Sequence, residues 1–314
     1  MAVFTLPPEM LGFYKYHIDY ITEKAVNPDR RRYAVDGEAP RHYIDMDDYG
    51  DTMKLPKYWK DAVAKYSEDT LQGRGIVPWH IYFMKYRLTE AFKSKNVRAI
   101  LLLSADIGHY IGDANVPLHT TSNYNGQKTN QVGIHGFWES RLPELYSDEY
   151  DFFTGQAKYI HDPQAAAWDM VNGAHAALDS VLRFEKELSA SFPEDKKYMY
   201  EQRGTQLLRT YSREFSSAYH SRLNGQVERQ MLKSIRMVGS FWYTCWVDAG
   251  QPDLDALIHP SDLDINHQDL EEDKKLQQDK IKARPHESFL NGTENGCTHL
   301  CCSDQHEKML TIAK

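Results

Sequence analysis

Apolar residues recur every three or four positions over several long stretches of the chain. Over residues 7–26, Met10, Phe13 and Ile21 follow this spacing after a Pro-Pro pair, which predicts a helix with one buried face. Residues 27–50 are rich in charges, Pro and Gly, and are predicted to form an ordered loop. The three- and four-residue spacing predicts further helices over residues 75–94, 96–115, 162–188, 197–223 and 226–250.

No stretch shows the alternation of β-branched and polar residues that is typical of a strand, and no segment repeats another. The chain is therefore predicted to be all-α, with a single-domain multi-helix bundle over residues 1–253. From residue 254 to residue 314, large apolar side chains are few and charged residues are many. This composition is typical of a flexible, disordered tail.

The composition is that of a globular protein, with 41% hydrophobic and 12% aromatic residues. A formal net charge of −8 argues against a broad nucleic-acid-binding surface, although metal ions can still hold a phosphate group in an acidic site. Three of the four cysteines lie within residues 297–302, so no disulfide framework spans the fold. No signal peptide is expected, and no segment is apolar enough over sufficient length to cross a bilayer.

One segment in the middle of the chain spaces histidines and acids regularly. His109 and Asp113 are four residues apart on a predicted helix, so they lie on one face, one turn apart. A proline then disfavours helix, and His119 follows it. After a polar loop, His135 and Glu139 repeat the four-residue spacing.

Imidazole nitrogens and carboxylate oxygens are ligands that zinc, manganese and iron accept. A single His-x-x-x-acid pair on a helix is more often a hydrogen-bonded or solvated pair than a metal site. Two such pairs and a further histidine around one loop, placed where an apolar helix becomes polar, favour a metal centre. The reason is that burying His and Asp is costly unless a cation pairs with them.

The stretch "GHYIGDANVPLH", followed by "GIHGFWE", resembles the zinc-dependent phospholipase C and single-strand-specific zinc nuclease superfamily. Its members are all-α phosphodiesterases with a zinc cluster in a cleft. The family pattern His-Phe/Tyr-x-Gly-Asp-x-x-x-Pro-x-His is met in full between His109 and His119. The next family pair is His-x-x-x-Asp in the nucleases and His-x-x-x-Glu in the phospholipases, so His135 and Glu139 favour the phospholipase form. The resemblance covers roughly residues 1–253.

The resemblance also implies an aspartate and then a histidine upstream of this segment. The histidine is His42. The aspartate is either Asp29, which has the family-like distance and an Arg shortly after it, or Asp36, which is closer in sequence. A turn residue or a surface ion pair is the alternative reading of either aspartate. Asp45 and Asp47 are placed to orient His42 from outside the ligand set.

By this resemblance, Asp29, His42, His109 and Asp113 hold one zinc ion, and His119, His135 and Glu139 hold a second. The third family zinc uses Asp113 with an N-terminal Trp and a nearby His. This chain begins "MAVFTLPPEM", has no Trp before Trp59, and has His17 as its first histidine. We therefore expect two zinc sites and an incomplete third one, which implies either a truncated start or a lost metal.

Paired zinc ions bind the oxygens of a phosphodiester and lower the pKa of a bound water. The resemblance thus implies a zinc-dependent hydrolase of phosphoric esters, with Asp29, Asp113 and Glu139 as catalytic carboxylates. Glu139 and the acidic net charge favour a phospholipase C-like activity. The alternatives are a single-strand-specific nuclease and a weakened, non-catalytic relative that still binds metal.

The expected partner is a phosphodiester substrate, either a phospholipid or a single-stranded nucleic acid. No stable nucleic-acid or protein partner is indicated, and a monomer is expected. Family members are usually secreted or periplasmic, whereas no signal peptide is visible here.

Overall fold

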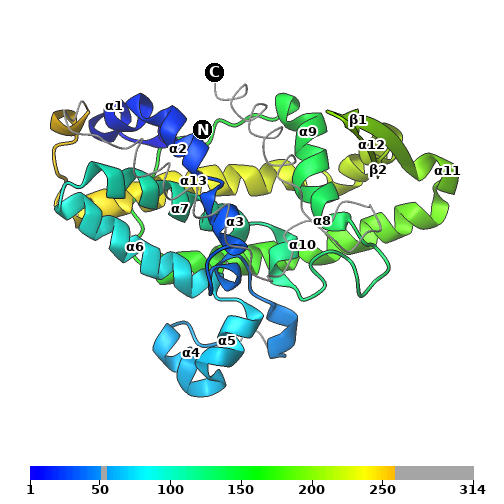
Figure 1. Ribbon diagram of the computed structural model, residues 1–314, viewed down its shortest axis with the longest axis horizontal. Coiled ribbons are helices and arrows are strands. Elements are labelled where there is room, and N and C mark those ends of the chain that lie inside the picture. Colours follow the sequence, from blue (N-terminus) through cyan, green and yellow to red (C-terminus); the bar gives the residue numbers. More distant parts are fainter. Residues whose placement is uncertain (51–54, 259–314) are drawn as a thin grey trace.

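The computed structural model describes residues 1–50 and 55–258, and it confirms the prediction of a mostly helical fold. Four long helices form the body of the molecule. Figure 1 shows α10 and α13 extending along its longest axis, with α6 and α7 packed beside them. Their bounds are Val77–Lys93 for α6, Val97–Ala114 for α7, Pro163–Ser191 for α10 and Gln226–Asp248 for α13.

Two of these helices begin at side-chain caps that their sequences supply. Asn96 Oδ1 accepts a hydrogen bond from the Ala99 N–H at the start of α7, at 3.0 Å. Asp162 does the same for the Ala165 N–H at the start of α10, at 2.9 Å. Each cap satisfies a backbone donor that the first helical turn leaves without a partner.

The larger of two apolar cores lies where α1 (Pro8–Tyr16) packs against α7 and α13. Tyr14 is fully buried, and its ring stacks on that of Trp242 with 4.7 Å between the ring centroids. Met10, Phe13 and Ile21 are also buried, which confirms the predicted buried face of this region.

The N-terminal region differs from its prediction in two ways. The single helix expected over residues 7–26 is divided at His17 into α1 and α2 (Ile18–Lys24). The expected loop contains a short helix, α3 (Asn27–Arg32), because Pro28 is compatible with the first turn of a helix. Two 3-10 turns follow, η2 (Ala39–His42) and η3 (Met46–Tyr49).

Shorter elements connect this region to the long helices. Figure 1 shows α4 and α5 projecting to one side of the bundle. After α7, the chain makes a 3-10 turn and a polar loop, then a short helical run with one π turn. In chain order, these elements are α4 (Trp59–Tyr66), α5 (Glu68–Arg74), η5 (Pro117–Thr120), α8 (Ile134–Gly136), the π turn η6 (Phe137–Arg141), α9 (Leu142–Tyr146) and η7 (Ser147–Glu149).

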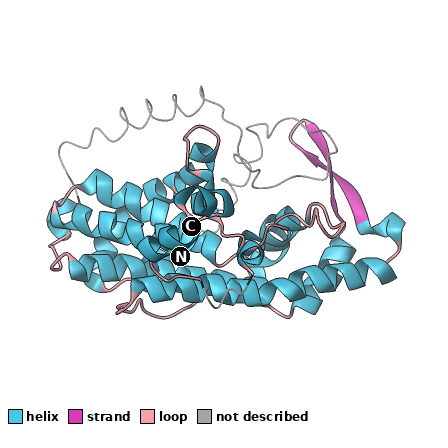
Figure 2. Cartoon of the chain, turned by 90° about the horizontal axis from the view of Figure 1, so that it is seen from below, coloured by secondary structure: helices cyan, strands magenta, loops and turns pink. Residues whose placement is uncertain are grey.

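The prediction of a helix over residues 197–223 is wrong for the first half of that segment. That half forms an antiparallel hairpin of β1 (Tyr198–Arg203) and β2 (Gln206–Tyr211), and only α12 (Arg213–Leu223) is helical. Figure 2 shows the hairpin rising at one end of the molecule, where it follows the short helix α11 (Glu194–Lys197). The strands use mainly Tyr and Leu, with Thr210 as their single β-branched residue, and Gly204 turns between them with a φ of 56°.

A second apolar core joins this end to the short elements after α7. The Phe137 ring stacks on that of Tyr211 at 3.8 Å between centroids, and Tyr219 and Phe215 pack beside it. Val116, Leu118 and Ile134 belong to the same core. The polar residues of the predicted metal centre therefore lie between two apolar cores.

The described chain ends with η8 (Asp255–Leu257). Leu254, the first residue of the predicted tail, is buried in the larger core. The prediction of a disordered tail otherwise falls on residues 259–314, which lie outside the described residues. Within the part of the chain that the structure describes, none of the helices has the length and apolar character needed to span a membrane.

Candidate metal centre

The structure brings the seven predicted ligands together from six elements of the chain. Asp29 lies on α3, and His42 ends η2. The other five residues follow one another along α7, η5, α8 and η6. Their polar atoms form two groups, which we call the first donor set (Asp29, His42, His109 and Asp113) and the second donor set (His119, His135 and Glu139).

The first donor set gathers two imidazoles and two carboxylates. His42 Nδ1 lies 3.1 Å from His109 Nε2, 2.8 Å from Asp113 Oδ2 and 3.7 Å from Asp29 Oδ1. His109 Nε2 lies 3.3 Å from Asp113 Oδ2 and 3.6 Å from Asp29 Oδ1. The ligand atoms of Asp29, His42 and His109 all lie within 4.8 Å of one another, and Asp113 Oδ2 adjoins both histidine nitrogens.

The second donor set is contributed by a single stretch of chain. His119 Nε2 lies 3.2 Å from His135 Nε2 and 3.6 Å from Glu139 Oε2, and His135 Nε2 lies 2.8 Å from Glu139 Oε2. Glu139 lies on the π turn η6. Pro143 has no N–H to donate to the Glu139 carbonyl, which favours the departure from α-helix at this position.

Zinc fits both donor sets by size. Tetrahedral zinc with bonds of about 2.0–2.1 Å holds its ligand atoms about 3.3 Å apart. The distances between ligand atoms in both sets run from 2.8 to 3.7 Å and bracket this value.

The hydrogen bonds of the second donor set fix where its lone pairs point. His119 Nδ1 lies 2.6 Å from the His42 carbonyl oxygen, and His135 Nδ1 lies 3.0 Å from that of Tyr124. A carbonyl can only accept, so each Nδ1 carries the proton and each neutral ring directs the lone pair of Nε2 at its neighbour. These two nitrogen atoms converge with Oε2 of Glu139, and a cation at that point satisfies all three acceptors at once.

The carboxylates of the first donor set also favour a positive charge at this position. Burial by itself would lower the pKa of His109, yet the nearby charges of Asp113 and Asp29 raise it well above its usual value. Burial by itself would raise the pKa of Asp113, yet His109 and His119 hold it well below the usual value. A metal ion supplies the same charge without protonating a histidine.

The two donor sets are neighbours. The carbonyl oxygen of His42 accepts the hydrogen bond from His119 Nδ1, and the Ile44 N–H donates to the His119 carbonyl at 2.9 Å. The rings of His42 and His119 are almost wholly buried, whereas the side chains of Asp29 and Glu139 are 24% and 23% exposed. Access from solvent is therefore on the side of these two carboxylates.

A buried guanidinium lies beside both sets. Arg32 is 3% exposed, its Nη2 is 3.7 Å from Asp29 Oδ1, and neither Nε nor Nη2 has a hydrogen-bond partner among the described residues. Its charge acts to lower the pKa of both His119 and His135, which places it near the second set too. A buried N–H donor without an acceptor lowers the stability of the fold. An anionic ligand could supply the acceptor for these donors.

Three expectations about neighbouring residues have different outcomes. Asp36 is exposed and accepts from the Gly37 N–H at 3.1 Å, so Asp29 is the aspartate that faces the histidines. Asp47 was expected to orient His42 but instead accepts from Thr121 and Ser122, an error that arises because η3 turns this side chain toward the polar loop. His17 packs at the break between α1 and α2, 5.0 Å from the Phe13 ring, and the expected incomplete third site stays a prediction.

The sequence analysis missed Glu38, which is fully buried beside His42. Burial alone would raise its pKa, yet the contact with His42 and the charge of Arg31 hold that pKa well below the usual range, so the carboxylate stays ionised. The signal was present in the sequence, because Glu38 and His42 have the same four-residue spacing as the two pairs that were noticed.

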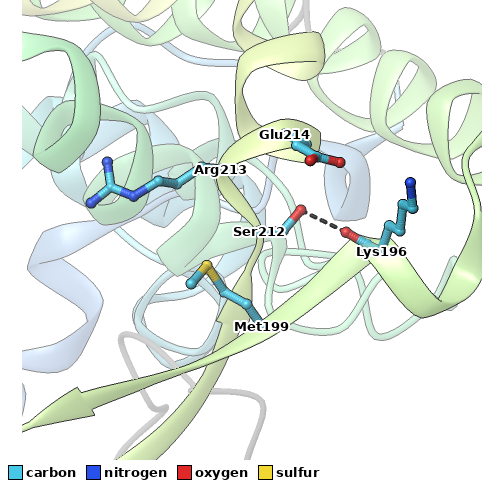
Figure 3. A pocket seen from close by; sticks show the side chains of 5 residues that line it. All are labelled: Lys196, Met199, Ser212, Arg213 and Glu214. Carbon is cyan, nitrogen blue, oxygen red and sulfur yellow. Dashed lines mark hydrogen bonds between the residues drawn. The ribbon is translucent and has the colours of Figure 1, made fainter.

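A surface pocket at the other end of the molecule has a different lining. Figure 3 shows Lys196, Met199, Ser212, Arg213 and Glu214 around it, where β1 meets the start of α12. Ser212 Oγ donates to the Lys196 carbonyl at 2.6 Å and accepts from the Phe215 N–H at 3.1 Å. These contacts cap a helix, and the pocket has no histidine–carboxylate group in its lining.

Within the part of the chain that the structure describes, the groups suited to metal and phosphate binding are the two donor sets and Arg32. The first set offers four protein ligands, and the second offers three. A comparison of the chain with models of known protein families and with curated proteins gave no match.

Proposed function

We propose that the protein is a zinc-dependent phosphodiesterase that hydrolyses phosphate esters in the manner of a phospholipase C. The observation that carries this proposal is a donor set of only three protein ligands next to a second metal-sized set and a buried guanidinium. Structural zinc sites are closed by four protein ligands, whereas catalytic sites leave a position open for water or substrate.

The anionic character of the substrate is inferred from Arg32. Its guanidinium is buried beside both sets, and its Nε and Nη2 donors have no hydrogen-bond partner among the described residues. A phosphate oxygen accepts charge-assisted hydrogen bonds from such guanidinium donors. In a merely structural metal site, the Asp29 carboxylate at 3.7 Å would be the sole counterion of this buried charge among the described residues.

Bound zinc in the two sets would act as a Lewis acid on the phosphoryl oxygens and make an attacking water more acidic. Asp113 would hold the ion together with His42 and His109, whose ring nitrogens lie 2.8 and 3.3 Å from its Oδ2 atom. Asp29 and Glu139, the partly exposed carboxylates, are placed to orient the attacking water and accept its proton. One P–O bond forms to the water oxygen, the bond to the leaving oxygen breaks, and that oxygen takes up a proton.

Arg32 would bind a non-bridging oxygen while the charge on the phosphoryl group builds up. Donors that are already fixed in place stabilise such charge without reorganisation at the moment of reaction. The side chain therefore serves both binding and catalysis in this proposal.

The proposal is tested by assays on the zinc-loaded protein with three substrates: bis(p-nitrophenyl) phosphate, phosphatidylcholine vesicles and single-stranded DNA. We expect hydrolysis of the nitrophenyl ester and of phosphatidylcholine, and its loss after chelation and in His109→Ala. The matched control is His161→Ala, which changes an exposed histidine outside both sets. Cleavage of DNA in place of phosphatidylcholine would favour the nuclease alternative. Zinc binding without hydrolysis of any substrate would favour the non-catalytic alternative.

A further inference from the structure

One of the four histidines in the donor sets is turned the opposite way from the others. His109, His119 and His135 each direct Nε2 at the ligand atoms of their set and donate Nδ1–H to a main-chain carbonyl oxygen, with the oxygen 2.6–3.0 Å away. His42 directs Nδ1 at its set instead, and its Nε2 points into the protein. Nε2 of His42 is buried and has no hydrogen-bond partner among the described residues.

Glu38 lies where the partner of this nitrogen would have to be. Its side chain is fully buried, and Oε1 is 3.8 Å from His42 Nε2. The carboxylate is fixed from several sides. Tyr110 donates its hydroxyl to Oε1, Arg41 Nη1 donates to Oε2 at 2.5 Å, and Arg31 Nη2 lies 3.5 Å from Oε1.

The contacts around Glu38 also connect it to α7. Tyr110 is adjacent in sequence to His109, and Arg31 pairs with Asp106 on the same helix at 2.9 Å. The charges of Glu38 and Asp106 balance those of Arg31 and Arg41, so this network needs no further cation for neutrality. Salt bridging alone therefore does not account for the approach of Oε1 to the histidine.

We propose that Glu38 is a positioning residue that accepts Nε2–H of His42 and so holds the tautomer in which Nδ1 is free to bind metal. A movement of the ring by about 1 Å closes the present gap to hydrogen-bond length. Carboxylate partners of this kind fix the orientation of a metal-bound imidazole and make it a stronger ligand. This inference rests on the proposed metal centre. It adds the residue that fixes the orientation of His42 in the first donor set.

The test is a zinc titration of Glu38→Gln, in competition with a chromophoric chelator and without substrate. We expect the first donor set to bind zinc about 10- to 100-fold more weakly, the range for loss of an outer partner, and the second set to bind as before. Asp36→Asn is the matched control, because it removes an exposed carboxylate two residues away. Affinity within threefold of the wild type, or an equal loss at both sets, would overturn the proposal.

A second measurement needs no variant and remains decisive if Glu38→Gln fails to fold. Nitrogen-15 NMR of the zinc-loaded full chain reports which ring nitrogen of each histidine is protonated. We expect His42 to carry its proton on Nε2 and zinc on Nδ1, opposite to His109, His119 and His135. Zinc on Nε2 of His42 would overturn the proposal. Because neither measurement depends on hydrolysis, both stand apart from a failure of the proposed activity.

Discussion

The two donor sets hold similar ligand atoms at similar distances, but they are assembled differently. The second set comes from one stretch, between His119 and Glu139, whereas the first joins α3, η2 and α7, which are far apart in sequence. The second set also relies on main-chain carbonyls to orient its rings, while the first relies in part on the buried carboxylate of Glu38. A local motif thus builds one site, and the tertiary fold builds the other.

This difference decides how each site depends on the rest of the molecule. The second set depends mainly on the local path of the chain, which Gly126 helps to define, since a side chain there would meet the Gln131 carbonyl oxygen at 2.4 Å. Its one long-range orienting contact is the hydrogen bond from His119 Nδ1 to the His42 carbonyl oxygen. The first set requires α3 and η2 to be packed against α7. Four kinds of experiment can break or sharpen the comparison.

The largest effect is expected from removing a direct ligand. His42→Ala and His135→Ala should each abolish tight zinc binding at their own set and spare the other, so that one equivalent of zinc remains. Loss of an outer partner alone weakens metal binding about 10- to 100-fold, and loss of a ligand should weaken it further, on the order of 10³-fold. Zinc content after dialysis measures this, with His161→Ala as the control. Loss of both metals in His135→Ala would show that the sets are not separable.

Zinc should stabilise the fold mainly through the first set. At a free zinc concentration about 100 times the Kd, one site contributes about 2.7 kcal/mol, or roughly 5–10 °C in Tm for a protein of this size. The clustered ligands of the second set can still chelate zinc in the unfolded chain, which reduces their contribution. Thermal unfolding with and without zinc should therefore show a smaller zinc-dependent rise in His42→Ala than in His135→Ala. Equal rises would contradict this account.

Zinc binding should remove a loss of stability that the metal-free protein shows as the pH rises. In the metal-free protein, the raised pKa of His109 contributes stability that is fully present below about pH 6.5 and is lost as the pH rises through the folded-state value. In the zinc-loaded protein, the ion replaces that proton, so this loss should disappear. Urea unfolding between pH 6 and pH 9, with and without zinc, measures the difference. A metal-free protein whose stability does not fall with rising pH would contradict the charge balance described for the first set.

The smallest effect is expected at Asp36. Asp36→Asn should leave zinc affinity within about twofold of the wild type, because its carboxylate is exposed and contacts only its own loop. Asp29→Asn should weaken the first set by more than tenfold, since Asp29 Oδ1 faces two histidines. Paired zinc titrations distinguish the two. A larger effect at Asp36 than at Asp29 would reverse the choice between these aspartates.

The same contrast explains what the sequence could predict. The second set and the His109–Asp113 pair were visible because a four-residue spacing on a helical segment is a local property. The choice between Asp29 and Asp36 was open, because it depends on how α3 packs against α7, and spacing alone does not determine that. Glu38 shared the informative spacing but lay in a segment expected to be an ordered loop rather than a helix.

The hairpin was missed for a different reason. Tyr198, Leu208 and Tyr211 fit a helical spacing as readily as a strand, and the strand form is stabilised by contacts with distant residues. Tyr211 packs on Phe137. Glu201 forms a bidentate ion pair with Arg141, in which Nη1 of Arg141 lies 2.9 Å from Oε2 of Glu201. Such tertiary contacts override local preference, and no short window of sequence contains them.

The central claim is that two metal ions bind at two defined donor sets. Anomalous diffraction from crystals of the zinc-loaded protein, measured on either side of the zinc absorption edge, tests it most directly. The account predicts one peak enclosed by Asp29, His42, His109 and Asp113, and a second enclosed by His119, His135 and Glu139. The absence of a peak at either position would contradict it.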